Sequence, residues 1–211
     1  MQHVVLLGDS IFDNAAYVRG APDVIRQLRQ LLPSGSTATL KAIDGSVTRD
    51  IRRQLAGIPS DATHLVVSIG GNDALRHTNI LNTAARSSAE VLSRIADIAD
   101  EFQRDYRQML QTVLSLHLPT ALCTIYYPRF PDPFLQRLAV TALSIFNDCI
   151  IREAFTHRLP LIDLRLVCDE DTDYANPIEP SERGGQKIAS AIRNLLAHHD
   201  FARPTTEVFI R

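Results

Sequence analysis

The sequence has no tryptophan, three cysteines and two methionines among its 211 residues, and it has no marked surplus of one charge. Its 22 Lys and Arg residues stand against 24 Asp and Glu residues, so the formal net charge is −2. Nucleic-acid binding needs a basic stripe, whereas these arginines are mixed with acids or spaced along predicted helices. The charge pattern therefore argues against a nucleic-acid partner.

Membrane and disulfide signals are also missing. Cys123, Cys149 and Cys168 have no CxxC spacing, and an odd count without a framework favours reduced, buried thiols. The N-terminus runs straight into an apolar segment, without the basic stretch and long apolar region of a secretory signal. No apolar run approaches the ~18 residues that a membrane span needs. These features predict a cytoplasmic protein with no membrane span.

Short apolar runs alternate with amphipathic segments along the chain. Residues 3–7, 64–69, 120–126 and 161–164 have the continuous apolar pattern of strands buried on both faces, and residues 37–43 are a weaker candidate. Helical spacing occurs over residues 23–32, 87–116, 134–155 and 181–197, with Ser181 as the expected N-cap of the last. This alternation predicts a single α/β domain over residues 1–211, with a parallel sheet covered by helices on both faces. Residues 203–211 form either a tail or an added strand.

Small and polar residues follow several of the predicted strands. Gly8, Asp9 and Ser10 follow the first, Gly45 follows the weaker candidate, and Asn72 follows the next. Ligands of an open parallel sheet bind outside the carboxyl ends of its strands. A serine hydroxyl exposed on a tight turn suits attack on an acyl carbon, and N–H donors stabilise the resulting oxyanion. We therefore expect one acyl-transfer pocket, with the Ser10 N–H, the Gly45 N–H and the Asn72 amide converging on one point.

Residues 8–11 (Gly-Asp-Ser-Ile) resemble the first block of the GDSL, or SGNH, hydrolases. Gly45 and residues 70–73 (Gly-Gly-Asn-Asp) resemble that family's second and third blocks, in the same order and at strand ends. The resemblance implies the SGNH hydrolase fold, a flavodoxin-like three-layer α/β/α sandwich with a five-stranded parallel sheet in the order 2-1-3-4-5. It also implies cleavage of a small-molecule carboxylic ester, or a related acyl bond, through a Ser10 acyl-enzyme. Ser10, Gly45 and Asn72 would form the oxyanion hole, with no metal or organic cofactor.

The last family block, Asp-x-x-His followed by Pro-Ser, is altered. Asn176 stands where Asp is expected and Glu179 stands where His is expected, although Pro180 and Ser181 keep the pattern. A carboxylate with a pKa of about 4.3 is a poorer base near neutral pH than an imidazole at about 6.5, unless burial raises its pKa. Asn176 could orient Glu179 by donating a hydrogen bond, which would favour the charged carboxylate and weaken the base.

Several alternatives stay open at this point. The general base is Glu179, or His77 from beyond the Asn72 block, or no residue; Asp163 is a further carboxylate expected near the pocket edge. Accordingly, the chain is an acyl hydrolase, a catalytically weakened binding or regulatory module, or an acyltransferase that uses the same serine. The sequence leaves the natural substrate and the oligomeric state undecided. Aromatic residues that could line an acyl pocket, or equally pack in the core, are Phe12, Tyr126, Tyr127, Phe130 and Phe134.

Overall fold

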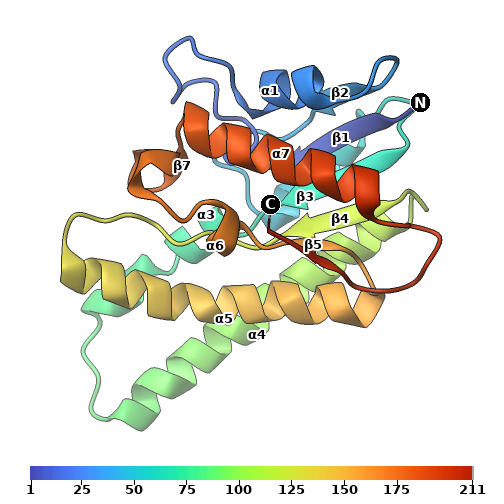
Figure 1. The fold of residues 1–211 in the computed structure, drawn as a ribbon. Helices are drawn as coiled ribbons and strands as arrows, with labels where there is room; N and C mark the ends of the chain where they lie inside the picture. The colour runs from blue at the N-terminus through green and yellow to red at the C-terminus, as the bar shows by residue number, and fades with distance from the viewer. Residues whose placement is uncertain (211) are drawn as a thin grey trace.

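A six-stranded parallel sheet forms the centre of the computed structural model, which describes residues 1–210 (Figure 1). The strand order is β2-β1-β3-β4-β5-β8, so the expected order of the first five strands is confirmed. The sixth strand decides the open question about residues 203–211, because Val208 pairs with Leu161 at the sheet edge. The strands are β1 (His3–Gly8), β2 (Thr37–Leu40), β3 (His64–Ser68), β4 (Thr120–Cys123), β5 (Leu161–Ile162) and β8 (Val208–Phe209).

Helices cover both faces of the sheet, as the α/β pattern predicts. The α-helices are α1 (Val24–Leu31), α2 (Ile51–Leu55), α3 (Gly71–Leu75), α4 (Ser88–Leu114), α5 (Pro133–His157), α6 (Leu164–Val167) and α7 (Glu182–His198). Three short 3-10 helices are η1 (Thr48–Asp50), η2 (Thr78–Asn82) and η3 (Asp171–Asp173). A separate antiparallel ribbon pairs β6 (Tyr174–Asn176) with β7 (Glu179–Pro180) just before α7.

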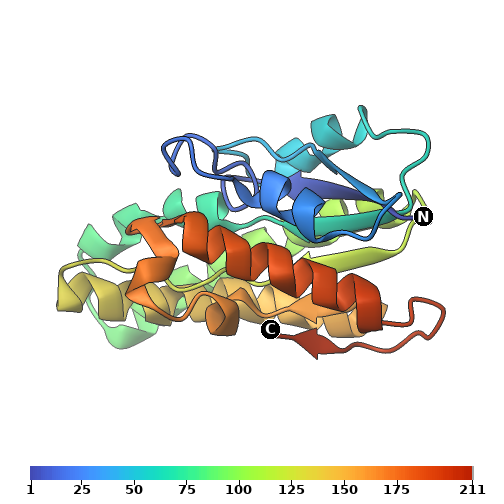
Figure 2. The same ribbon diagram turned by 45° about the horizontal axis from the view of Figure 1, so that its top comes forward.

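The alternation of side chains along β1 explains the three layers. Val4 and Leu6 belong to a core cluster with residues of α1 and α7, whereas Val5 and Leu7 belong to a second cluster with residues of α4 and α5. Successive residues of a strand point to opposite faces, so a continuous apolar run buries both faces at once. Figure 2 shows α1 and α7 on one side of the sheet and α5 on the other. The three cysteines are buried and unpaired, as expected.

Side-chain caps mark where the helices begin. Asp23 accepts a hydrogen bond from the Arg26 N–H at the start of α1, and Ser181 accepts one from the Gly184 N–H at the start of α7. These caps satisfy N–H groups that have no partner inside the helix. The predicted cap at Ser181 is thereby confirmed, and it fixes α7 immediately after the ribbon that carries Glu179.

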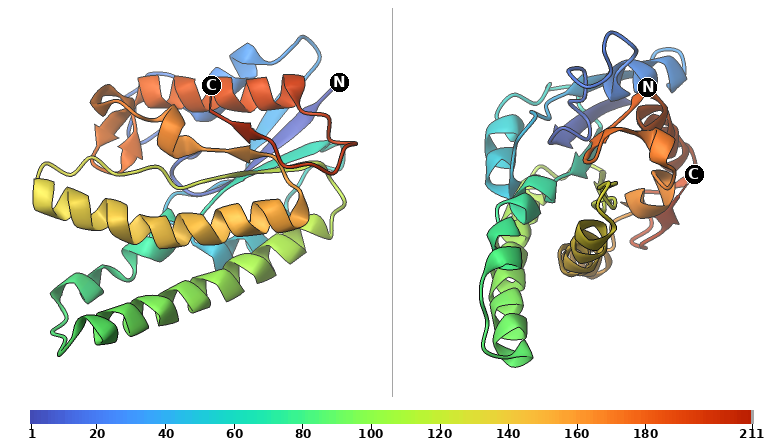
Figure 3. Two further views of the ribbon diagram at one scale, coloured as in Figure 1. Left: turned by 60° about the horizontal axis from the view of Figure 1, so that its bottom comes forward. Right: turned by 90° about the vertical axis from the view of Figure 1, so that its left-hand side faces the viewer.

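Helix α5 is only half covered by the rest of the protein. Its buried residues begin at Phe146, whereas residues 133–145 are partly or fully exposed. Figure 3 shows the first half of α5 extending past the sheet. Its length and composition alone would let it cross a membrane, a test that the core helix of a soluble protein also meets. The uncovered half flanks the carboxyl end of the sheet, where the candidate site lies.

Candidate active site

Gly8 positions Ser10 at the end of β1. The φ of Gly8 is +142°, and a Cβ atom at this position would lie 1.8 Å from the Ser68 carbonyl oxygen, so only glycine fits. Asp9 then closes a tight turn, because its Oδ1 accepts a hydrogen bond from the Ile11 N–H at 3.2 Å. This turn places the Ser10 side chain at the wall of a cavity, with 7% of the residue exposed.

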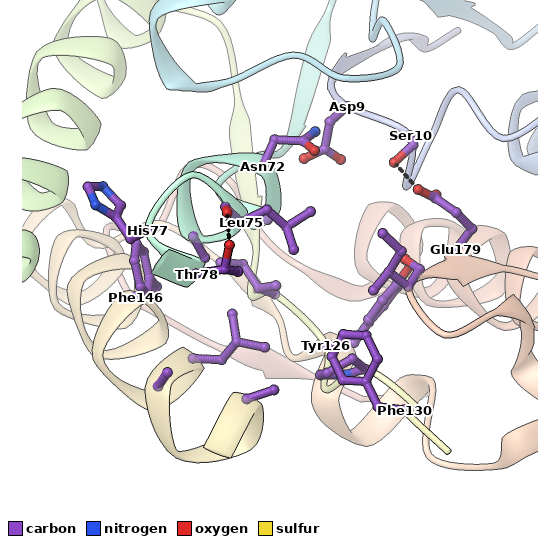
Figure 4. Close-up of a pocket in the computed structure, with 18 of the residues that line it drawn as sticks. Asp9, Ser10, Asn72, Leu75, His77, Thr78, Tyr126, Phe130, Phe146 and Glu179 are labelled. Carbon is purple, nitrogen blue, oxygen red and sulfur yellow. Dashed lines mark hydrogen bonds between the residues drawn. The ribbon is translucent and has the colours of Figure 1, made fainter. Parts of the chain in front are cut away.

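Glu179 contacts Ser10 directly. The Ser10 hydroxyl donates a hydrogen bond to Glu179 Oε1 at 3.1 Å (Figure 4). The two residues meet because β7 lies beside the turn that follows β1, although 169 positions separate them in the chain. The structure thus brings the Glu179 carboxylate into hydrogen-bond contact with the Ser10 hydroxyl.

Asn176 positions Glu179 through the backbone. Its side-chain oxygen accepts hydrogen bonds from the Ile178 N–H at 3.0 Å and from the Glu179 N–H at 3.1 Å. The expectation that Asn176 donates to the Glu179 side chain is therefore wrong, because the amide oxygen is turned toward the ribbon's backbone. Asn176 therefore fixes the backbone of Glu179 without donating to its carboxylate.

The Glu179 carboxyl group is buried, and no Lys or Arg of residues 1–210 forms an ion pair with it. The residue is 7% exposed, and within residues 1–210 its Oε2 has no hydrogen-bond partner. Burial raises the pKa of Glu179 to about 7, against a lowering by the Ser10 hydrogen bond; the charge of Asp44 adds to the rise. An ordinary imidazole has a pKa of about 6.5. Glu179 therefore has nearly the proton affinity of the histidine that the family pattern places here.

Two further acids, Asp9 beside Ser10 and Asp73 beside Asn72, also have raised pKa values. Burial raises the pKa of Asp9 to about 8, against a lowering by the Ile11 N–H; the charges of Glu179 and Asp73 add to the rise. Burial also raises the pKa of Asp73, against hydrogen bonds from the backbone and hydroxyl of Thr48. At neutral pH this region therefore carries less negative charge than its three carboxyl groups suggest. No group of three potential metal ligands occurs among the residues that the structure describes.

Asn72 lies on the same cavity as Ser10, whereas Gly45 does not. The Asn72 Nδ2 donates to the Ser46 carbonyl at 3.0 Å, which uses one of its two N–H bonds and fixes the amide in place. Gly45 is exposed on a turn closed by the Ser46 N–H to Ile43 carbonyl hydrogen bond, and it lines a separate hollow with Asp44. Gly45 is thus not among the residues that line the Ser10 cavity, and the role of its N–H in an oxyanion hole stays a prediction.

The structure places His77 and Asp163 away from the Ser10 hydroxyl. Figure 4 shows His77 at the opposite end of the cavity from Ser10, with Leu75 between them. The His77 ring lies against Phe146, with ring centroids 6.4 Å apart. Asp163 pairs with Arg165 at 2.6 Å and accepts from Thr124 at 2.9 Å, and it does not belong to the cavity lining. Of the three base and edge candidates weighed from sequence, Glu179 is the one that contacts Ser10.

The cavity extends well beyond the strand ends, where the sequence predicted a pocket. It has a volume of about 480 Å³ and extends from Ser10 between α3–η2 and α5. Two of the expected aromatic residues, Tyr126 and Phe130, line it, whereas Phe12 is in the core and Phe134 is exposed. The sequence analysis did not predict that α5 residues form part of its wall. The sequence does contain a signal for this, because α5 is apolar on more faces than one buried stripe requires. They are Leu135, Ala139, Ala142, Leu143 and Phe146.

Comparisons with known proteins agree on the fold. An extracellular lipase from Streptomyces rimosus has 17% identity and a TM-score of 0.65, and the match covers 89% of this chain and 96% of that one. Phospholipase A1 from Streptomyces albidoflavus has 17% identity and a TM-score of 0.63, with 92% and 98% covered. A variant of an acetyl xylan esterase from Geobacillus stearothermophilus also has 17% identity and a TM-score of 0.63, with 94% and 96% covered.

The sequence comparisons identify the family. A search among curated proteins finds no match. The family model described as "GDSL-like Lipase/Acylhydrolase family" matches residues 6–187, which include the Ser10 turn, Asn72 and Glu179. We conclude that the chain belongs to the GDSL-like lipase/acylhydrolase family.

Proposed function

We propose that this protein is a serine hydrolase that cleaves carboxylic esters, with Ser10 as nucleophile and Glu179 as general base. Family membership supports ester hydrolysis in general. The observation that carries the finer proposal is the 3.1 Å hydrogen bond from Ser10 Oγ to Glu179 Oε1. Because burial raises the pKa of Glu179 to about 7, this carboxylate can both accept and return a proton near neutral pH.

The proposed reaction has two halves. Ser10 Oγ attacks the ester carbonyl carbon while its proton passes to Glu179 Oε1, and the tetrahedral intermediate then expels the alcohol, which takes that proton from Glu179. Water next attacks the acyl-enzyme, giving one proton to Glu179 and releasing the carboxylic acid. Glu179 finally returns the proton to Ser10 Oγ. A single carboxyl group thus serves as base and acid in turn.

Two donors are proposed for the oxyanion of each intermediate. They are the Ser10 N–H and one N–H of the Asn72 side-chain amide. The other N–H of that amide donates to the Ser46 carbonyl. Because that contact fixes the amide, the second donor needs no reorganisation during the reaction. Loss of one donor of this kind costs about 3–4 kcal/mol of transition-state stabilisation. Gly45 is left out of this proposal because it lines another hollow.

Hydrolysis of p-nitrophenyl acetate tests the proposal. We expect turnover that Ser10→Ala abolishes, and labelling of Ser10 by a fluorophosphonate. His77→Ala should retain most of the turnover, because His77 lies at the far end of the cavity (Figure 4). Turnover that persists in Ser10→Ala would refute the assignment of the nucleophile. An acyl-enzyme that is discharged by an added alcohol but not by water would favour the acyltransferase alternative.

A further inference from the structure

Resting on the proposed function, we propose that the cavity beyond Ser10 binds an unbranched apolar acyl chain, so that the substrate is a medium- or long-chain fatty acyl ester rather than an acetyl ester. The cavity begins at Ser10 and continues between α3–η2 and the uncovered half of α5. An occupant of the cavity therefore lies next to the Ser10 hydroxyl.

One face of α5 forms the long wall of this cavity. The lining residues recur at three- and four-residue spacing, which places them along a single helical stripe. Ala139 and Ala142 lie in the middle of the stripe, and their small side chains leave room that a larger residue would fill. Leu75 and Leu81 belong to the opposite wall. The space between the two walls is thus lined mainly by apolar side chains.

The distribution of charge along the cavity agrees with an apolar chain. Within the described lining, the acidic side chains Asp9 and Glu179 lie at the Ser10 end, and no Lys or Arg contributes. Between that end and His77 the walls consist mainly of aliphatic and aromatic side chains. Such a surface gains from burying methylene groups and offers no partner for an ionic substrate.

The size of the cavity is unsuited to an acetyl group. Its volume of about 480 Å³ lies within the range that small-molecule ligands occupy. At ~30 Å³ for each water molecule in the liquid, a space of this size corresponds to more than ten waters. An acetyl group has three heavy atoms and would leave most of the apolar wall in contact with water. A chain of eight or more carbons would cover it.

The position of Glu179 assigns the cavity to the acyl side of the ester. Glu179 must return its proton to the departing alcohol, so the alcohol lies on the Glu179 side of Ser10. Figure 4 shows Glu179 at one end and Leu75, Thr78 and Phe146 extending away from it. The substituent on the other side of the carbonyl carbon, which is the acyl chain, therefore points into the cavity.

Chain-length series test the inference. We expect kcat/KM for p-nitrophenyl esters to rise from acetate to octanoate by at least about 100-fold, since each buried methylene is worth up to roughly fourfold. Acetate esters of alcohols of increasing length should show no comparable rise. Ala142→Phe, which fills the middle of the stripe, should lower the octanoate-to-acetate ratio at least about tenfold. The matched control Thr141→Phe, an exposed neighbour outside the cavity, should leave both rates unchanged.

Binding of methyl octanoate to Ser10→Ala, followed by calorimetry, tests the site without catalysis. We expect methyl octanoate to bind and methyl acetate not to bind. Adding Ala142→Phe to the Ser10→Ala variant should weaken the binding of methyl octanoate. A flat acyl series with intact, Ser10-dependent acetate turnover would overturn the chain site and leave the hydrolase proposal standing. Chain binding without turnover would overturn only the hydrolase proposal. A dimer that Ala142→Phe dissociates, together with a flat series, would mean that the cavity is a subunit contact.

Discussion

Asp173 and Glu179 are two buried carboxylates in the same short segment before α7, yet their surroundings are opposite. Asp173 is fully buried and accepts from Lys187 Nζ at 2.7 Å and from the Glu170 N–H at 2.9 Å. Glu179 is 7% exposed, and its recorded side-chain partner is the Ser10 hydroxyl. A cation faces one acid and a neutral hydroxyl faces the other.

The difference separates an anchoring role from a chemical one. The Asp173–Lys187 pair fastens the segment to α7, and the Asp173 carbonyl also accepts from the Ser181 N–H at 2.8 Å. The Lys187 ammonium lies directly against the buried Asp173 carboxylate and compensates its charge. A buried carboxylate without a neighbouring cation binds a proton more readily, and the pKa of Glu179 is raised accordingly. One acid therefore fixes the platform from which the other acts.

Glu179→Gln is the strongest test of this contrast. We expect kcat/KM for p-nitrophenyl acetate to fall by about 10²–10⁴-fold, because the amide cannot accept the Ser10 proton. Asp173→Asn is the comparator and should keep kcat/KM within a few-fold of wild type at a temperature where it is folded. The contrast would be broken if Asp173→Asn lost as much activity as Glu179→Gln while retaining its structure.

Glu179→Gln, which should lose the most activity, should cost the protein little or no stability. The pKa of Glu179 is raised on folding, so the folded state binds more protons and stability falls as pH rises from about 4.5 to about 7. Glu179→Gln removes this loss and should melt no lower than wild type at pH 8. A large decrease in its melting temperature would show that the Glu179 carboxylate is also an anchor.

Lys187→Met should act on the anchor alone. It leaves Asp173 buried without its closest cation, for which we expect a loss of about 2–3 kcal/mol in unfolding free energy. For a chain of this size that corresponds to a decrease of roughly 4–12 °C in melting temperature. Asp173→Asn should cost less in the Lys187→Met background than in wild type. Equal costs in both backgrounds would mean that the pair is not coupled.

The pH profile of kcat/KM gives the finest measure of the comparison. Glu179 must be ionised to act as base, so kcat/KM should rise about tenfold per pH unit below pH 7 and level off above it. Asp9→Asn is the control, because the Asp9 carboxyl, whose pKa is raised to about 8, is not in the proposed proton path. A rising limb centred near pH 4.5 would show that burial does not tune Glu179. Loss of the limb in Asp9→Asn would transfer the base to Asp9.

The sequence was most informative where local pattern dictates structure. Continuous apolar runs predicted the sheet, and the cap at Ser181 predicted the start of α7, because burial and capping act over a few neighbouring residues. The pattern at residues 8–11 placed a serine on a turn after the first strand, and the structure gives Gly8 a φ of +142° there. Gly45 lines a separate hollow in the structure, which the local pattern did not indicate.

The sequence by itself determined the α/β architecture, the strand order carried by the family resemblance, and the identity of the carboxylate that replaces the family histidine. Tertiary structure alone decided that this carboxylate reaches Ser10, since residues 169 positions apart meet only when the β6–β7 ribbon docks beside β1. It also decided that burial raises the pKa of Glu179 and that α5 leaves a cavity open. A pKa depends on the water and charges around a group, and a cavity depends on which parts of a helix other elements leave uncovered. Neighbours that are distant in the sequence decide both.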